Sequence, residues 1–229
     1  MKILVVNPVG TTRYDKSDLK YLKKKAGMDL ELELVSLRKG PVEITTFQSQ
    51  VEICPEILEI LREKKYDAAI INCFANPCID AAKEASDKPV VGPGEAALYL
   101  SLLLGDRISI ISPVDATVPQ FRLNVRKMGI EKRISSIRSV KIDVKSLEDD
   151  SGVTTAAILR EAKRSIEIDG AEVVVLGCTG MAYVADEIRK RLSVPVIEPL
   201  YAALKVAELL AQANLRQSKY LIYRGEHEC

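Results

Sequence analysis

An internal repeat constrains the fold of this chain more than any other feature of its sequence. Residues 2–9, KILVVNPV, return as RISIISPV at 107–114, and AAIINC at 68–73 returns as VVVLGC at 173–178. PVVGP at 89–93 returns as PVIEP, starting at residue 195. Duplication at this scale predicts two lobes of the same fold. We place the first lobe at 1–97 and the second at 98–204, and we expect the C-terminal segment 205–229 to pack back on the first.

The pattern within each half is typical of an α/β protein. Short runs of β-branched residues alternate with longer segments of helical periodicity, which predicts parallel sheets built from βα units. We therefore expect two pseudo-symmetric lobes, each a small parallel sheet flanked by helices, with the active site in the cleft between them. The predicted strands are 2–6, 30–36, 67–72, 89–91, 107–112, 133–142, 171–176 and 195–197. The predicted helices are 16–26, 48–64, 76–86, 115–128, 153–169, 181–192 and 199–214.

Composition excludes several classes of function. With 33 basic and 32 acidic residues, the chain has no electrostatic reason to bind nucleic acid or a membrane surface. The apolar run that follows Lys2 is too short for a signal peptide or a membrane span, so we expect a cytoplasmic protein with a small-molecule substrate. His227 is the only histidine, which argues against a His-based metal site and a Ser-His-Asp triad. Five cysteines do not suggest the disulfide framework of a small secreted protein.

Two of these cysteines, Cys73 and Cys178, occupy matching positions in the repeat. Each ends a run with the character of a buried strand and precedes a predicted helix, which in the first half begins with Asn76 as N-cap and Pro77 as first helical residue. A thiol at a helix N-terminus can have its pKa lowered from about 8.5 to between roughly 3.5 and 7.5. A cysteine beside an apolar strand can also be a small packed hydrophobe. The occurrence of a cysteine at this position in both halves favours a catalytic role. Cys78 has no counterpart in the second half and is expected to be packed.

Two thiols on opposite sides of one carbon could invert a stereocentre. A thiolate removes the proton from one face and a thiol supplies a proton to the other, with no need for a metal or cofactor. The carbanion formed on the way requires hydrogen-bond donors at the oxygen of an adjacent carbonyl. Residues with suitable side chains follow the predicted strands, although each could equally be an ordinary cap or turn residue: Thr11, Thr12, Asn72, Asn76, Thr117 and Thr179. The loop 38–46 has no match in the second half and is a predicted specificity element.

At these residues the chain resembles the aspartate/glutamate/hydantoin racemase superfamily, and within it the hydantoin racemases. NCFANP at 72–77 is similar to the first cysteine motif of that branch, and GCTGM at 177–181 is similar to the second. The resemblance implies a two-lobed, cofactor-independent isomerase with one catalytic cysteine per lobe, and it suggests a homo-oligomer. Two departures concern the loop 7–12, NPVGTT, which lacks a second Asn, and Asn76, where the branch commonly has Asp.

Carried over to this chain, the resemblance makes Cys73 and Cys178 the acid/base pair, each deprotonating one enantiomer. The residues expected to contact substrate are Asn7, Thr11, Thr12, Pro41, Ile44, Phe74, Ala75, Asn76, Thr117, Thr179 and Gly180. The aspartate and glutamate branches usually have an acidic residue after Gly-Cys-Thr, where this chain has Gly180. We therefore expect racemisation of a 5-substituted hydantoin or a related cyclic ureide such as allantoin.

The sequence leaves alternatives of two classes open. The same scaffold could racemise aspartate or glutamate, and it could isomerise maleate or catalyse a decarboxylation. The decarboxylase alternative is weakened because decarboxylases of this type keep one cysteine, whereas this chain has both. From a different class, two hinged lobes could form a non-catalytic protein that binds a small ligand.

Overall fold

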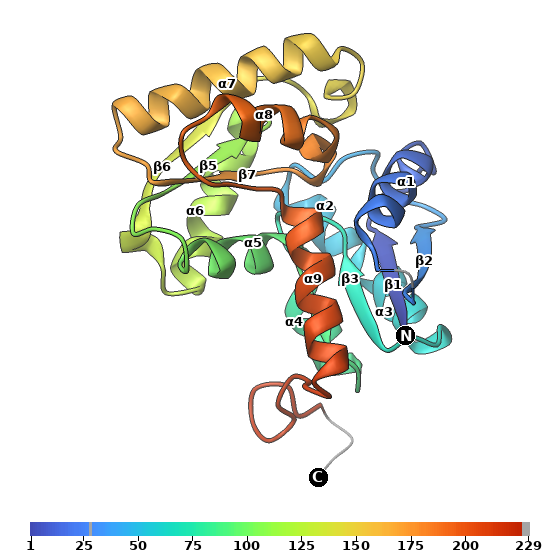
Figure 1. The fold of residues 1–229 in the computed structure, drawn as a ribbon. Coiled ribbons are helices and arrows are strands. Elements are labelled where there is room, and N and C mark those ends of the chain that lie inside the picture. Colours follow the sequence, from blue (N-terminus) through green and yellow to red (C-terminus); the bar gives the residue numbers. More distant parts are fainter. Residues whose placement is uncertain (28, 226–229) are drawn as a thin grey trace. The chain divides into compact units, whose positions relative to one another are not determined.

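A computed structural model describes residues 1–27 and 29–225, and the chain divides into two compact units (Figure 1). The first unit contains Met1–Pro93 together with the chain from Ala203 onward, and the second contains Gly94–Ala202. The points of division fall within helices α5 (Pro93–Ser101) and α9 (Pro199–Gln212). His227 and Cys229, which close the segment predicted at 205–229, lie outside the described residues.

The first unit is built around a four-stranded parallel sheet with the strand order β2-β1-β3-β4. Its strands are β1 (Lys2–Asn7), β2 (Glu31–Ser36), β3 (Ala68–Ile71) and β4 (Val90–Val91). Its helices are α1 (Asp15–Lys25), α2 (Phe47–Glu52), α3 (Cys54–Glu63) and α4 (Ile79–Ala85). The central strands β1 and β3 are buried on both faces, which explains why they are continuous apolar runs in the sequence.

One face of this sheet packs against α3 and α4. Alternate strand residues such as Leu4 and Ile71 point to this face, where they meet the apolar stripe of α3 formed by Ile57, Ile60 and Leu61. Each fully buried aliphatic side chain contributes about 1.5–3 kcal/mol relative to an exposed one. This core holds the carboxyl ends of β1 and β3 in place.

The second unit repeats this architecture with the order β6-β5-β7-β8. Its strands are β5 (Ile108–Ser112), β6 (Ile134–Ser139), β7 (Val173–Leu176) and β8 (Val196–Ile197). Val6 pairs with Ile71 in the first sheet, and their counterparts Ile111 and Leu176 pair in the second. The register therefore follows the sequence repeat, and the predicted α/β fold with one small parallel sheet in each lobe is confirmed.

Helices cover both faces of the second sheet (Figure 1). The α-helices of this unit besides α5 and α9 are α6 (Val118–Lys127), α7 (Ser151–Glu167) and α8 (Ala185–Arg191). Short 3₁₀ helices occupy Asp115–Thr117, Glu131–Arg133, Val144–Ser146 and Thr179–Val184. Buried residues of α7 and α8 share one core with β5 and β7, and Phe121 of α6 packs beside Gly177. Within the described ranges, no helix is both long enough and apolar enough to cross a membrane.

Several predicted helices differ from those observed. The helix predicted at 48–64 is divided at Ile53, because Pro55 has no N–H for an α-helical bond and instead lies in the first turn of α3. The helix predicted at 76–86 begins only at Ile79. Asn76 and Cys78 instead have φ angles of 54° and 57°, in the left-handed region, so the predicted cap at Asn76 and Pro77 is wrong. The helix predicted at 181–192 begins as 3₁₀ turns, and α5 has no predicted counterpart.

Candidate active site

Cys73 lies at the carboxyl edge of the first sheet, two residues beyond β3. The N–H of Asn72 continues the sheet pairing by donating to the carbonyl oxygen of Val6 at 2.8 Å. The carbonyl of Cys73 then accepts the N–H of Asn76 at 3.1 Å, which closes a turn. The Cys73 side chain is half-buried and packs against the core of the first unit.

Cys178 has the same backbone arrangement in the second unit. The N–H of Gly177 donates to the carbonyl oxygen of Ile111 at 2.8 Å, and the carbonyl of Cys178 accepts the N–H of Met181 at 3.1 Å. Each of these residues is 105 positions beyond its counterpart at Cys73. Both cysteines carry half-buried thiols that take part in no disulfide. The two halves of the chain thus present a thiol on the same turn, at the same edge of the same type of sheet.

Burial raises the pKa of the Cys73 thiol to about 11, and a hydrogen bond from the backbone N–H of Ala75 offsets only part of this effect. The side chain keeps some exposed surface, yet the surrounding protein disfavours its thiolate. The prediction of a lowered pKa is therefore wrong for Cys73. Its physical basis is missing, because α4 begins at Ile79 and no helix dipole starts directly after the thiol. At neutral pH Cys73 is a protonated thiol.

Cys178 directly precedes the 3₁₀ helix Thr179–Val184. A Cβ atom built on Gly180 would lie 3.5 Å from the sulfur of Cys178, so the glycine leaves that side of the thiol less crowded. Thr179 is buried beside it. Tyr183 follows on the same short helix, and its hydroxyl donates to the carbonyl oxygen of Leu147. Burial raises the pKa of Tyr183.

A buried polar network lies behind the carboxyl edge of the first sheet. The amide nitrogen of Asn7 donates to Asp15 at 3.1 Å and to Asp18 at 3.0 Å. The amide nitrogen of Asn72 donates to Asp18 at 3.1 Å and to the amide oxygen of Asn7 at 2.7 Å. Ser36 donates to Asp15 at 2.5 Å. Because ionised carboxylates only accept hydrogen bonds, they fix the orientation of both amides.

This network determines which side-chain atoms of Asn7 and Asn72 are available to a ligand. Both donor positions of the Asn7 amide are used by carboxylates, and its oxygen already accepts from Asn72. The side-chain oxygen of Asn72 is buried and has no hydrogen-bond partner within the described part of the chain. A buried amide oxygen without a donor costs about 1–3 kcal/mol, so a water molecule or a ligand N–H would bind there favourably.

The other candidates of the first unit lie on neighbouring loops. The N–H of Gly10 donates to the carbonyl oxygen of Pro41 at 3.0 Å, which brings the loop with Thr11 and Thr12 beside the loop 38–46. The hydroxyl of Thr11 accepts the N–H of Arg13 at 3.2 Å in a local turn. The remaining candidates differ in burial. Ile44 belongs to the apolar core, Phe74 and Ala75 are buried beside Cys73, and Asn76 is partly exposed.

Thr117 is the remaining candidate of the second unit, and it corresponds in the repeat to Thr12. Its buried hydroxyl lies 2.5 Å from that of Ser112 and donates to the carbonyl oxygen of Val114 at 2.9 Å. The structure thus gathers the first-unit candidates around one sheet edge. It places Thr117, Cys178, Thr179 and Gly180 after the corresponding strands of the second sheet.

Three polar residues close to these candidates were not identified from the sequence: Asp15, Asp18 and Tyr183. A signal for Asp18 exists, since it precedes Leu22 by four residues and shares the buried face of α1 with it. A carboxylate on a buried helix face has to be paired. Among the described residues, no group of three or more His, Cys, Asp or Glu side chains could hold a metal ion.

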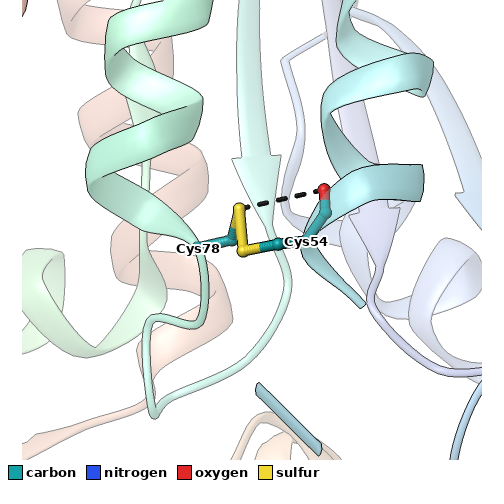
Figure 2. Close-up of a disulfide and its surroundings, with 2 residues drawn as sticks. All are labelled: Cys54 and Cys78. Atoms are coloured by element: carbon teal, nitrogen blue, oxygen red, sulfur yellow. Dashed lines mark hydrogen bonds between the residues drawn. A yellow bond between two sulfur atoms is a disulfide. The ribbon is translucent and has the colours of Figure 1, made fainter. Parts of the chain in front are cut away.

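The sequence suggests no disulfide framework, yet the first unit contains one cross-link, between Cys54 and Cys78. Their sulfur atoms are bonded in the first unit, as Figure 2 shows. Cys78 does pack against the apolar core, as expected.

A family model described as Asp/Glu/Hydantoin racemase matches residues 3–207 of the chain. The chain belongs to the Asp/Glu/hydantoin racemase family. A hydantoin racemase of Pseudomonas sp. (strain NS671) is 34% identical over 227 residues, which cover 98% of this chain and 91% of the relative. The protein is therefore a racemase, which is a type of isomerase.

Two solved structures share the fold of this racemase. The allantoin racemase from Klebsiella pneumoniae has a TM-score of 0.94 and 28% sequence identity, with 100% of this chain and 95% of that chain covered. The allantoin racemase from Pseudomonas fluorescens has a TM-score of 0.95 at the same identity, with coverages of 100% and 98%. These findings confirm the predicted resemblance to the racemase superfamily.

Proposed function

We propose that this racemase acts on 5-substituted hydantoins or related cyclic ureides such as allantoin, through proton transfer between Cys73 and Cys178. The observation that carries the proposal is the matching backbone around the two thiols, each held by the same pair of hydrogen bonds after an equivalent strand. The relatives add support, because a hydantoin racemase and two allantoin racemases are similar to this chain over nearly its whole length.

In this mechanism the reacting carbon lies between a ring carbonyl and a ring nitrogen. One sulfur, as thiolate, takes the proton from this carbon, and the electron pair of the C–H bond moves onto the ring carbonyl as an enolate. The other sulfur, as thiol, donates its proton to the opposite face of the carbon, and the enolate returns its electrons. Each turnover inverts the carbon and exchanges the roles of the two sulfurs, so no external acid, base or cofactor is consumed.

The raised pKa of Cys73 suggests the order of these roles. A thiol with a pKa of about 11 is protonated at neutral pH, so the resting Cys73 is a proton donor. We infer that Cys73 is the proton donor toward the enantiomer that the resting enzyme processes first. Cys73 becomes the base in the reverse direction, where its high pKa makes it the stronger acceptor of a proton from carbon.

The chemistry of the candidate contacts supports a neutral ring as substrate. None of the eleven predicted substrate-binding residues carries a charge. Aspartate or glutamate would bring two carboxylates and an ammonium group, which are costly to bury without opposite charges. A cyclic ureide presents only N–H and C=O groups, which asparagine and threonine side chains and backbone groups can bind.

We further propose that the enzyme is a cytoplasmic homo-oligomer, which fractionation and light scattering would test.

Polarimetry with pure enantiomers tests the proposed substrate class. We expect hydantoin enantiomers or allantoin to lose optical rotation, while aspartate and glutamate keep theirs. A protein in which Cys73 and Cys178 are both replaced by serine is the control for spontaneous racemisation. Racemisation of aspartate or glutamate alone would contradict the proposal in favour of an amino-acid racemase. Binding of these compounds without turnover would instead favour a ligand-binding protein.

A further inference from the structure

The Cys54–Cys78 disulfide lies close in sequence to Cys73, but the proposed reaction does not use it. Cys54 is the first residue of α3, and Cys78 directly precedes α4. Their Cα atoms are 5.4 Å apart, and 24 positions separate them in the chain. The bond therefore ties together the beginnings of two helices that pack against the same core (Figure 2).

Cys73 and Cys78 delimit a short loop with an unusual backbone. Asn76 and Cys78 both have left-handed φ angles, a conformation that costs free energy in residues other than glycine and persists where the surroundings hold it. Asn76 is held on one side by Gly92, where a Cβ atom would overlap its side chain. Cys78 is held by its covalent bond to Cys54. With only four residues between Cys73 and Cys78, a change at Cys78 is transmitted to Cys73 through very little chain.

Reduction would replace this covalent tie with a much weaker contact. The sulfur of Cys78 lies 3.9 Å from the carbonyl oxygen of Cys54. It has no hydrogen to donate in the disulfide, and as a thiol it would be a weak donor over that distance. A small-molecule disulfide can oxidise the pair, since the two protein thiols lose two hydrogens and the reagent becomes two thiols. A dithiol such as dithiothreitol reverses this exchange.

We propose that the Cys54–Cys78 disulfide is a positioning element that fixes the loop carrying Cys73 and makes the racemase responsive to thiol–disulfide exchange. This inference rests on the proposed role of Cys73. In the oxidised protein the loop is fixed and Cys73 keeps its buried setting. In the reduced protein the left-handed backbone at Cys78 loses its covalent support, the loop relaxes, and water gains access to Cys73.

The experiment compares the native full-length protein before and after treatment with dithiothreitol. Peptide mass spectrometry first establishes whether Cys54 and Cys78 are bonded. The rate of alkylation of Cys73 by iodoacetamide is then measured against pH, and kcat and KM are measured for both enantiomers. We expect reduction to lower the apparent pKa of Cys73 and to lower kcat about tenfold with a smaller change in KM, because small displacements of reacting groups have large effects on rate. Reoxidation with a small-molecule disulfide should restore both values.

Variants separate this effect from general loss of structure. The substitutions C54S and C78S should each reproduce the reduced state and make the protein insensitive to dithiothreitol. C229S removes a thiol and leaves the pair intact, so it should respond like the native protein. Circular dichroism identifies any variant that fails to fold, and reduction of the native protein then provides the test alone.

Two results would overturn the inference. A native protein whose Cys54 and Cys78 remain thiols after treatment with oxidant would show that the bond does not form. A bond that forms but leaves both the alkylation profile of Cys73 and kcat unchanged on reduction would show a simple cross-link. The alkylation profile needs no turnover, so it tests the positioning of Cys73 even if every candidate substrate fails and the proposed function is wrong.

Discussion

The side-chain amide of Asn72 donates a hydrogen bond to the carboxylate of Asp18 at 3.1 Å, in the buried interior of the first unit. Asn72 is the residue immediately before Cys73, and Asp18 lies on α1. The same carboxylate oxygen accepts a hydrogen bond from Asn7 at the end of β1. A single buried carboxylate thus fixes the ends of the two strands that lead into the candidate site.

Replacing Asp18 with asparagine should destabilise this arrangement. The side-chain oxygens of Asn7 and Asn72 supply no charge to replace that of the carboxylate, and hydrogen bonds to a charged acceptor are about twice as strong as those to a neutral amide oxygen. Weakening these two buried hydrogen bonds should cost about 1–3 kcal/mol, which urea unfolding would measure as a lower free energy of unfolding. The matched control is D87N, an exposed carboxylate of the same unit. Equal stabilities of D18N and D87N would show that the network does not hold the strand ends.

The raised pKa of Cys73 predicts a specific pH dependence. Alkylation of this residue in the folded protein should accelerate with rising pH up to about 11, whereas in the unfolded protein it should level off near pH 8.5. The folded state therefore retains a proton that the unfolded state releases in this range. The raised pKa of Cys73 therefore contributes to the stability of the folded state. This contribution is fully present below about pH 8.5 and is lost as the pH rises toward 11. A midpoint near or below neutral pH in the folded protein would contradict the account.

Gly177 precedes Cys178 and has no space for a side chain. A Cβ atom there would lie 2.8 Å from the carbonyl oxygen of Ile111 and 3.1 Å from Phe121. We expect G177A to lose about 1–3 kcal/mol of stability through overpacking and to racemise more slowly, because the turn that carries the thiol has to shift. The control is G27A, where a Cβ atom would meet nothing within 4 Å. Thermal unfolding and polarimetry measure both effects, and a G177A protein as stable and active as G27A would refute the argument.

The repeat and the alternation of strands and helices were sufficient to predict the two sheets. Parallel strands buried on both faces appear in the sequence as continuous apolar runs, and the duplication fixed which runs correspond, as the pairing of Val6 with Ile71 and of Ile111 with Leu176 shows. The positions of Cys73 and Cys178 just beyond equivalent strands can be predicted from the same pattern. Local sequence is sufficient where a single buried strand determines the outcome.

The errors arose where distant contacts override local preference. Asn76 and Pro77 are good helix-starting residues, yet the chain takes two left-handed residues before α4, one of them bonded to Cys54. The pKa of Cys73 could not be inferred from its place after a strand, since burial by residues remote in sequence decides it. The role of Asp18 could not be inferred from local sequence either, because its partners are Asn7 at the end of β1 and Asn72 just beyond β3.

Proton exchange in single-thiol variants tests the two-thiol mechanism most directly. C73S and C178S are incubated separately with each pure enantiomer in deuterium oxide, and deuterium at the reacting carbon is measured by mass spectrometry alongside optical rotation. We expect both variants to lose racemisation, with exchange surviving for only one enantiomer in each and for opposite enantiomers in the two. Full racemisation by both C73S and C178S would contradict the mechanism.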